Sequence, residues 1–199
     1  MTSPRVCDDA GQAFPIYITV VGGLLLLALA YFAVGQAAGT RNQAQTAADA
    51  AALAAALETR DSLADQWLDN VRDPASWQDI FEGKTAFPNA CWRAQELAAR
   101  NDARVDCEPD GLLGYRVSAE TNDTVGDTIV PGTEDQKATE SATAVIEARC
   151  SPKPPAEDTE GDALPSLACK GGEDWDLTPD DLSNLPKPED LFDVHLADS

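Results

Sequence analysis

The stretch NQAQTAADAAALAAAL, residues 42–57, decides how this chain is built. Alanine dominates it, Asp49 is its only charged residue, and it follows an apolar run that ends before Arg41. Alanine loses no side-chain entropy in a helix, and its small side chain lets a second helix or a sheet approach the backbone closely. We therefore expect a stiff helix with a close-packing face. Asp49 should meet water, a polar neighbour or a partner's basic residue, because an unpaired charge is costly in a tight interface.

The helix should continue to Pro74, because strong helix formers dominate residues 36–73 and no proline interrupts them. Apolar residues recur there at intervals of three, four or seven, which predicts one shared face: Leu53, Leu57, Ala64, Trp67 and Val71. The residues expected to pack closely against another element or subunit are Gly35, Gly39, Ala47, Ala48, Asp49, Ala51, Leu53 and Ala55. Gly35 and Gly39 form a small-xxx-small pair, which is a weak signal on its own.

The run GQAFPIYITVVGGLLLLALAYFAVG, residues 11–35, carries no charge and is long enough to cross a bilayer of about 30 Å as a helix. We expect a cytoplasmic head at 1–12, a transmembrane helix at 13–35 and an alanine-rich helical stem at 36–73. A cleaved secretory signal is the alternative. It fits less well, because Arg5 is offset by Asp8 and Asp9 and the apolar run is longer than a usual signal core.

Four cysteines follow the span: Cys91, Cys107, Cys150 and Cys169. An even number in a small hydrophilic region is typical of disulfides in an oxidising compartment, so we expect the body outside the membrane and the N-terminus in the cytoplasm. Three pairings are open. A helix over 89–100 and a strand over 103–107 would bring Cys91 and Cys107 to one level, which favours that pair and leaves Cys150 for Cys169. Cys7 stays a lone thiol, either inert or lipidated beside the membrane.

Residues 74–150 predict a small extracytoplasmic α+β domain with a short antiparallel sheet. SWQDIF and CWRAQELAAR read as helices, the second capped by Asn89, and ARVDC, EPDG and LLGYRVSAET read as a hairpin. KATESATAVIEARC, residues 137–150, reads as a third strand. Its alternation does not decide whether the even-numbered or the odd-numbered residues face inward.

Residues 151–199 hold thirteen Asp and Glu against three Lys, with proline throughout. We expect an acidic, mostly irregular tail with little core, although its apolar residues could lie across a surface. The formal net charge of the chain is -21, which makes nucleic acid and anionic lipid headgroups poor partners, since both would repel such a surface; we expect no nucleic-acid partner.

No catalytic motif, phosphate-binding glycine loop or zinc spacing occurs in the sequence, so we expect no enzyme, no catalytic residue, no cofactor and no metal site. The single histidine, His195, reads as a solvated side chain. Calcium is disfavoured, because no EF-hand loop accompanies the acidic residues. Asn122 lies in a short glycosylation pattern that is weak without knowledge of the host.

Residues 11–57 resemble the amino-terminal domain of TadE/TadG-like proteins, accessory components of the tight-adherence (Flp-type) pilus machinery of bacteria. The marks are Gly11 and Gln12 before the span, the span itself, and Asn42, Gln45 and the run Ala47–Ala54 after it. The resemblance implies an envelope protein of actinobacterial type with a pilin-like stem. It makes Gly11 the candidate processing site, although Ile16 stands where pilin-like members carry an acid. The D-x-S-x-S motif of larger TadG-type members does not occur.

We expect a non-enzymatic, single-pass protein of the cell membrane that assists assembly or anchoring of a Tad/Flp-type pilus or a related secretion structure. Its partners would be the membrane and other pilus-assembly or pilin-like subunits, with self-association through the stem. The alternative is a membrane-anchored surface binding module whose acidic tail captures a cationic or cell-wall ligand. An envelope hydrolase would need a nucleophile and a base that the chain does not offer.

Overall fold

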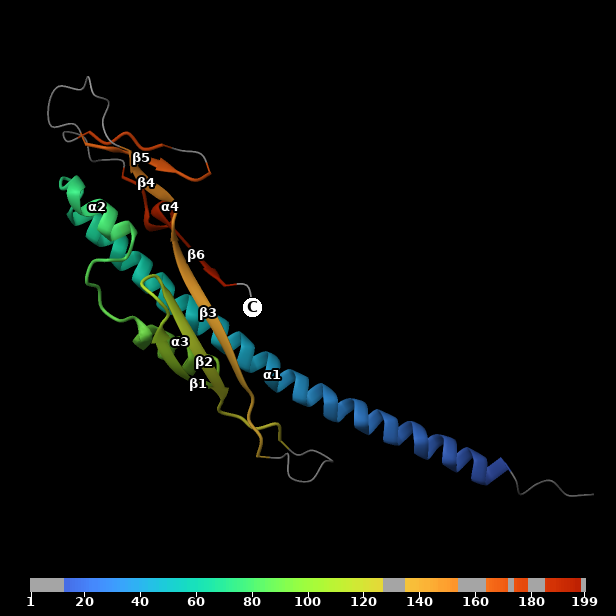
Figure 1. Ribbon diagram of the computed structural model, residues 1–199. Helices are drawn as coiled ribbons and strands as arrows, with labels where there is room; N and C mark the ends of the chain where they lie inside the picture. The colour runs from blue at the N-terminus through green and yellow to red at the C-terminus, as the bar shows by residue number, and fades with distance from the viewer. Residues whose placement is uncertain (1–12, 127–134, 154–163, 172–173, 179–184, 198–199) are drawn as a thin grey trace, which may run out of the picture.

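The computed structural model describes residues 13–126, 135–153, 164–171, 174–178 and 185–197, and shows a long helix that carries a small head at one end (Figure 1). The helices are α1 (Ala13–Asp69), α2 (Pro74–Phe81), α3 (Cys91–Arg100) and α4 (Pro188–Leu191), and the strands are β1 (Ala103–Pro109), β2 (Gly114–Thr121), β3 (Thr139–Ala148), β4 (Cys150–Lys153), β5 (Ser166–Cys169) and β6 (Phe192–Leu196). One antiparallel sheet has the order β1-β2-β3-β6, and β4 and β5 form a separate two-stranded ribbon. The expected mixed α+β fold with a long N-terminal helix and a small disulfide-bonded sheet domain is confirmed.

α1 is a single uninterrupted helix of 57 residues. At 1.5 Å per residue it is about 85 Å long. Its N-terminal half projects from the head, whereas its C-terminal half lies along the sheet (Figure 1). The rod predicted from the sequence is therefore present, but from Ala44 onward it is part of the core of the head.

The alanine-rich part of α1 packs against one face of the sheet, where it lies alongside β3 (Figure 1). Eight alanines of α1 have no exposed surface: Ala44, Ala47, Ala48, Ala51, Ala52, Ala55, Ala56 and Ala64. The strands oppose them mainly with small or β-branched residues, among them Val117, Ala119 and Ala144. Small side chains on both surfaces let the helix and the sheet approach closely, so dispersion contacts are made along the whole stretch.

The structure decides the register of β3. Ala142, Ala144 and Ile146 are buried, whereas Ser141 and Glu147 are exposed. The even-numbered residues of this strand therefore face α1. The sequence left this choice open because alanine and threonine alternate with little difference in hydropathy.

β1 and β2 form the predicted hairpin. The two disulfides join the cysteines in the pairs that the sequence favours. Cys91 at the start of α3 is bonded to Cys107 in β1, with 5.6 Å between their Cα atoms, and Cys150 in β4 is bonded to Cys169 in β5. The backbone N–H of Cys91 donates a hydrogen bond of 2.8 Å to Asn89 Oδ1, so Asn89 contacts the start of α3, although Ala90 and not Asn89 is the N-cap residue. Each disulfide ties two neighbouring elements together.

The prediction of a mostly irregular C-terminal region is wrong for part of it. β5 pairs with β4, and β6 joins the main sheet by pairing with residues 144–148 of β3. Leu191 and Phe192 are buried, and the Phe192 ring lies 5.4 Å from that of Phe81. Along β6 the exposed residues Asp193 and His195 alternate with Phe192, Val194 and Leu196. The acidic composition of the region therefore hid a strand with one apolar face.

The Tyr115 hydroxyl joins three elements in the interior. It lies 2.8 Å from Thr59 Oγ1 of α1 and accepts a hydrogen bond of 3.2 Å from the Ala90 N–H that precedes α3. Both residue side chains are almost fully buried, with 2% of Tyr115 and 1% of Thr59 exposed. This contact fixes the position of β2 relative to α1.

Replacing Tyr115 by Phe should lower the free energy of unfolding by about 1–3 kcal/mol, because it leaves the buried Ala90 N–H without its partner and removes that of Thr59. Chemical denaturation of the full-length protein in detergent would measure the change. Thr59→Val supplies the second arm of a double-mutant cycle, in which the two substitutions should not be additive. Fully additive effects would contradict the shared hydrogen bond.

Candidate functional site

The exposed half of α1 is the first functional feature of the molecule. Its large apolar side chains are exposed, with exposed fractions between 37% for Val21 and 83% for Tyr31. An 18-residue window within it has a mean hydropathy of 2.3 and no buried residue. Among the described residues, α1 is the one helix that is long and apolar enough to cross a membrane. A solvent-exposed apolar surface of this size needs a lipid or protein environment.

Between this apolar segment and the head, α1 has a short junction, residues 35–41, that makes little contact with the head. Gly35 and Gly39 are exposed, and a Cβ added to either would meet nothing within 4 Å. Arg41, the first charged residue after the span, forms an ion pair with Glu140 at the start of β3. The junction therefore presents a smooth helix surface, and the head is held to it just beyond.

The structure corrects the expectation that the alanine-rich stem packs beside other subunits. Ala47, Ala48, Ala51 and Ala55 have no exposed surface, because the chain's own sheet and α3 cover this part of α1. Leu53 is half-buried and packs against the same core. A neighbouring subunit cannot reach these alanines without displacing the sheet, so they serve the fold of the head.

The face predicted from apolar spacing also needs one correction. Ala64, Trp67 and Val71 are buried as expected, but Leu57 is 38% exposed. The sheet packs against the alanine stripe, which consists of the fully buried alanines of α1 between Ala44 and Ala64, because only small residues allow its close approach. Leu57 is turned away from that stripe. The spacing of apolar residues therefore predicted wrongly that Leu57 shares the buried face of α1.

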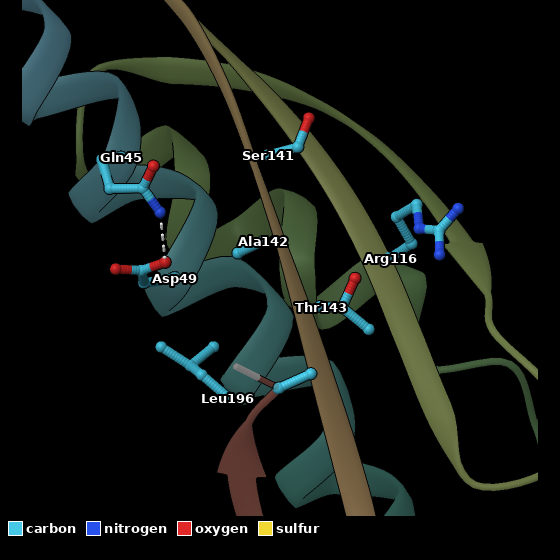
Figure 2. A pocket seen from close by; sticks show the side chains of 8 residues that line it. Gln45, Asp49, Arg116, Ser141, Ala142, Thr143 and Leu196 are labelled. Atoms are coloured by element: carbon cyan, nitrogen blue, oxygen red, sulfur yellow. Dashed lines mark hydrogen bonds between the residues drawn. The ribbon is translucent and has the colours of Figure 1, made fainter. Parts of the chain in front are cut away.

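A hollow of about 330 Å³ lies at the edge of β3 beside α1, at the end of the alanine stripe nearer the membrane segment (Figure 2). Its lining comprises Gln45, Asp49, Arg116, Ser141, Ala142, Thr143, Leu196 and Ala197. In Figure 2, Gln45 and Asp49 extend from α1 on one side of β3, with Leu196 beside them. Asp49 is half-buried, and its Oδ1 accepts a hydrogen bond of 2.7 Å from Gln45 Nε2. Asp49 thus meets a polar neighbour, one of the surroundings expected for it.

A second hollow of about 400 Å³ lies between residues 83–89 and the β1–β2 turn. Thr85 Oγ1 is buried there without a hydrogen-bond partner. The turn includes Gly111 at φ 74°, a left-handed conformation that glycine adopts at no steric cost. Otherwise the lining consists largely of apolar side chains and backbone, with no converging charged groups that would mark a reactive centre.

A small charged network covers the outer surface of α3. The Arg93 guanidinium lies 5.7 Å from the centre of the Trp92 ring and pairs with Glu96 at 2.5 Å. The hydrogen bond from Arg93 holds the pKa of Glu96 below its ordinary value. Helical spacing explains this cluster, which is typical of a solvated helix face.

The remaining residues singled out in the sequence are His195, Gly11 and Cys7. His195 is exposed on β6, with Nδ1 3.0 Å from Asp193 Oδ2. Within the ranges that the structure covers, no group of three or more His, Cys, Asp or Glu side chains is placed to hold a metal ion. Gly11 and Cys7 lie outside the described residues, so the predictions of processing and lipidation stay predictions.

Comparison with known proteins agrees with the resemblance of the N-terminal region. A family model, Tad, described as "Putative Flp pilus-assembly TadE/G-like", matches residues 11–58. The matched segment includes the exposed apolar half of α1 and most of the alanine stripe, and ends before Thr59. No curated protein and no solved structure matches the chain.

Proposed function

We propose that this protein is a non-enzymatic, single-pass envelope protein that assists assembly or anchoring of a Tad/Flp-type pilus or a related secretion structure. One observation carries the proposal: the segment similar to the pilus-assembly family is one continuous helix that is exposed and apolar at one end and built into a disulfide-bonded head at the other. A helix without a break transmits position and orientation from the membrane to the head. This is what an assembly factor needs.

The proposed orientation has the N-terminus in the cytoplasm and the head outside the membrane. Both described disulfides lie in the head, and such bonds persist in oxidising compartments. Protease added to intact cells should therefore digest the head, after any outer layer has been made permeable. Cleavage that required lysis of the cytoplasmic membrane would contradict this orientation.

The covered alanines move the proposed contact with other subunits to the junction. Gly35 and Gly39 lie one helical turn apart on one exposed surface, where a second helix could approach the backbone closely. The sheet covers the stem only from about Ala44 onward. We therefore place association with pilin-like subunits or a second copy on the apolar half of α1 and this glycine pair.

Replacing both Gly35 and Gly39 by Leu should lower association in the membrane about tenfold or more, because the larger side chains keep the helices apart. Energy transfer between labelled full-length chains in lipid vesicles would measure self-association. Pili counted by electron microscopy, in a host that depends on this chain, would measure assembly. The matched control, Ala33→Leu with Ala37→Leu, adds the same side chains at the same spacing on the opposite side of the helix.

The proposal requires that cells with the glycine variant lose pili although the variant protein is present at normal abundance. Cells with the alanine control should retain their pili. Normal pili in a host that lacks the chain would overturn the pilus role. Equal loss in both variants would show that the glycine surface is not the contact. Retained pili with the glycine variant would favour the alternative of a surface binding module on a simple stalk.

A further inference from the structure

The two neighbours of β3 pair with different parts of it, and they leave one side of its first residues open. β2 pairs with its residues 139–145, but β6 pairs with residues 144–148 and then ends. Beyond this pairing, the Ala197 N–H donates a hydrogen bond of 2.8 Å to the Thr143 carbonyl. Among the described residues, no strand lies beside residues 139–142 on this side, so a short stretch of β3 is a sheet edge.

The hydrogen-bonding groups of this edge can be assigned from their neighbours. The Thr121 N–H donates to the Ala138 carbonyl, which directs the even-numbered residues of β3 toward β2. Successive residues of an antiparallel strand direct their backbone groups to opposite sides. The odd-numbered residues therefore face the β6 side, as the bond at Thr143 shows. Thr139 and Ser141 consequently present their N–H and C=O groups along the open edge.

The hollow in Figure 2 lies beside this edge and extends the line of β6. Gln45 and Asp49 of α1 form one wall, Ser141, Ala142 and Thr143 form the other, and Leu196 and Ala197 mark its end. With a volume of about 330 Å³ it can receive a few side chains of an added strand. A peptide that pairs with β3 here would have side chains directed at Asp49.

The charge of the hollow indicates which side chain fits. Asp49 is half-buried and accepts a hydrogen bond from Gln45, and no described ion pair includes it. The other charged residue of the lining, Arg116, already binds Asp110 at 2.9 Å. A partly desolvated carboxylate without a cation gains when a basic group reaches it.

We propose that residues 139–143 of β3 accept an extended segment of a partner protein as an added strand, with a Lys or Arg of that segment bound to Asp49. Backbone hydrogen bonds to Thr139 and Ser141 supply affinity, and the carboxylate supplies specificity. A second copy is a poor occupant in antiparallel pairing. Because β3 lies alongside α1 (Figure 1), two copies joined through these edges would direct their membrane helices in opposite directions.

Labelled peptides of sequence TVTKVTV and TVTEVTV test the proposal by fluorescence anisotropy with the full-length protein in detergent. The lysine peptide should bind at least about tenfold more tightly than the glutamate peptide, and Asp49→Asn should remove this preference. Ser141→Pro should weaken binding about tenfold or more, because it removes one outward N–H but no bond to β2. Ser141→Ala keeps that N–H and should bind like the wild type.

Hydrogen exchange tests the proposed strand pairing without any substitution. The Thr139 and Ser141 amides should be protected about tenfold more strongly when the lysine peptide is bound, whereas the Val105 amide on the far edge should not change. No binding at about 1 mM peptide, equal binding of both peptides, or unchanged protection at residues 139 and 141 would overturn the proposal. Binding only to a chain shortened to end at Ala197 would also overturn it, because residues 198–199 would then be the occupant.

Discussion

Replacing Phe192 by Ala should destabilise the head by about 3–5 kcal/mol, although the residue lies in the most acidic region of the sequence. The Phe192 side chain is 1% exposed, and its ring lies 5.4 Å from that of Phe81, the last residue of α2. Its removal leaves a cavity beneath the end of the sheet and takes away the aromatic contact. Thermal or chemical unfolding of the full-length protein in detergent, followed by circular dichroism, would measure the loss.

Asp193→Ala is the matched control, because it truncates the exposed neighbouring residue of the same strand. We expect this change to alter stability by less than about 0.5 kcal/mol. Similar small effects for both variants would show that β6 does not belong to the cooperative core. The open edge of β3 would then extend along residues 144–148 as well.

The local elements of this fold could be predicted because their signals lie within a few residues. The turn residues of EPDG specify the β1–β2 hairpin, and strong helix formers without proline specify α1. The pairing of Cys91 with Cys107 follows from two adjacent elements of similar length. In each case neighbouring residues determine the geometry.

The place of β6 could not be predicted, because its pairing with β3 bridges more than forty residues by sequence position and depends on backbone groups. Backbone hydrogen bonds leave no mark in composition, and Phe192 and Val194 make only a short alternating pattern among acidic residues. Proline and charged residues dominate the average hydropathy of that region. A strand of five residues is too short to outweigh them.

The candidate site shows the same limit. The sequence predicts that Asp49 meets water, a polar neighbour or a partner's basic residue, and Gln45, one turn away, is such a polar neighbour. The sequence could not reveal that β6 stops short of the end of β3, which creates the hollow beside Asp49. Alanine has a similar ambiguity, since a surface of small residues suits a neighbouring subunit and the chain's own sheet equally well.

Substituting Leu for both Ala51 and Ala55 separates these two uses of the alanine stripe. Both residues have no exposed surface between α1 and the sheet, so added side chains must move the helix away from the strands. Overpacking costs about 1–3 kcal/mol at each site, and the isolated head should lose most of its stability.

The matched control is Ala99→Leu on the exposed surface of α3, which should change stability by less than about 0.5 kcal/mol. Unfolding is measured at high dilution in detergent, where chains are separate. If the stripe were an intersubunit surface, the double variant would unfold like the wild type there and differ only in its association within membranes. If the stripe holds the sheet, stability falls at every protein concentration, and any loss of pili follows from the misfolded head. The glycine pair then remains the place on this helix where assembly can be disrupted while the head stays folded.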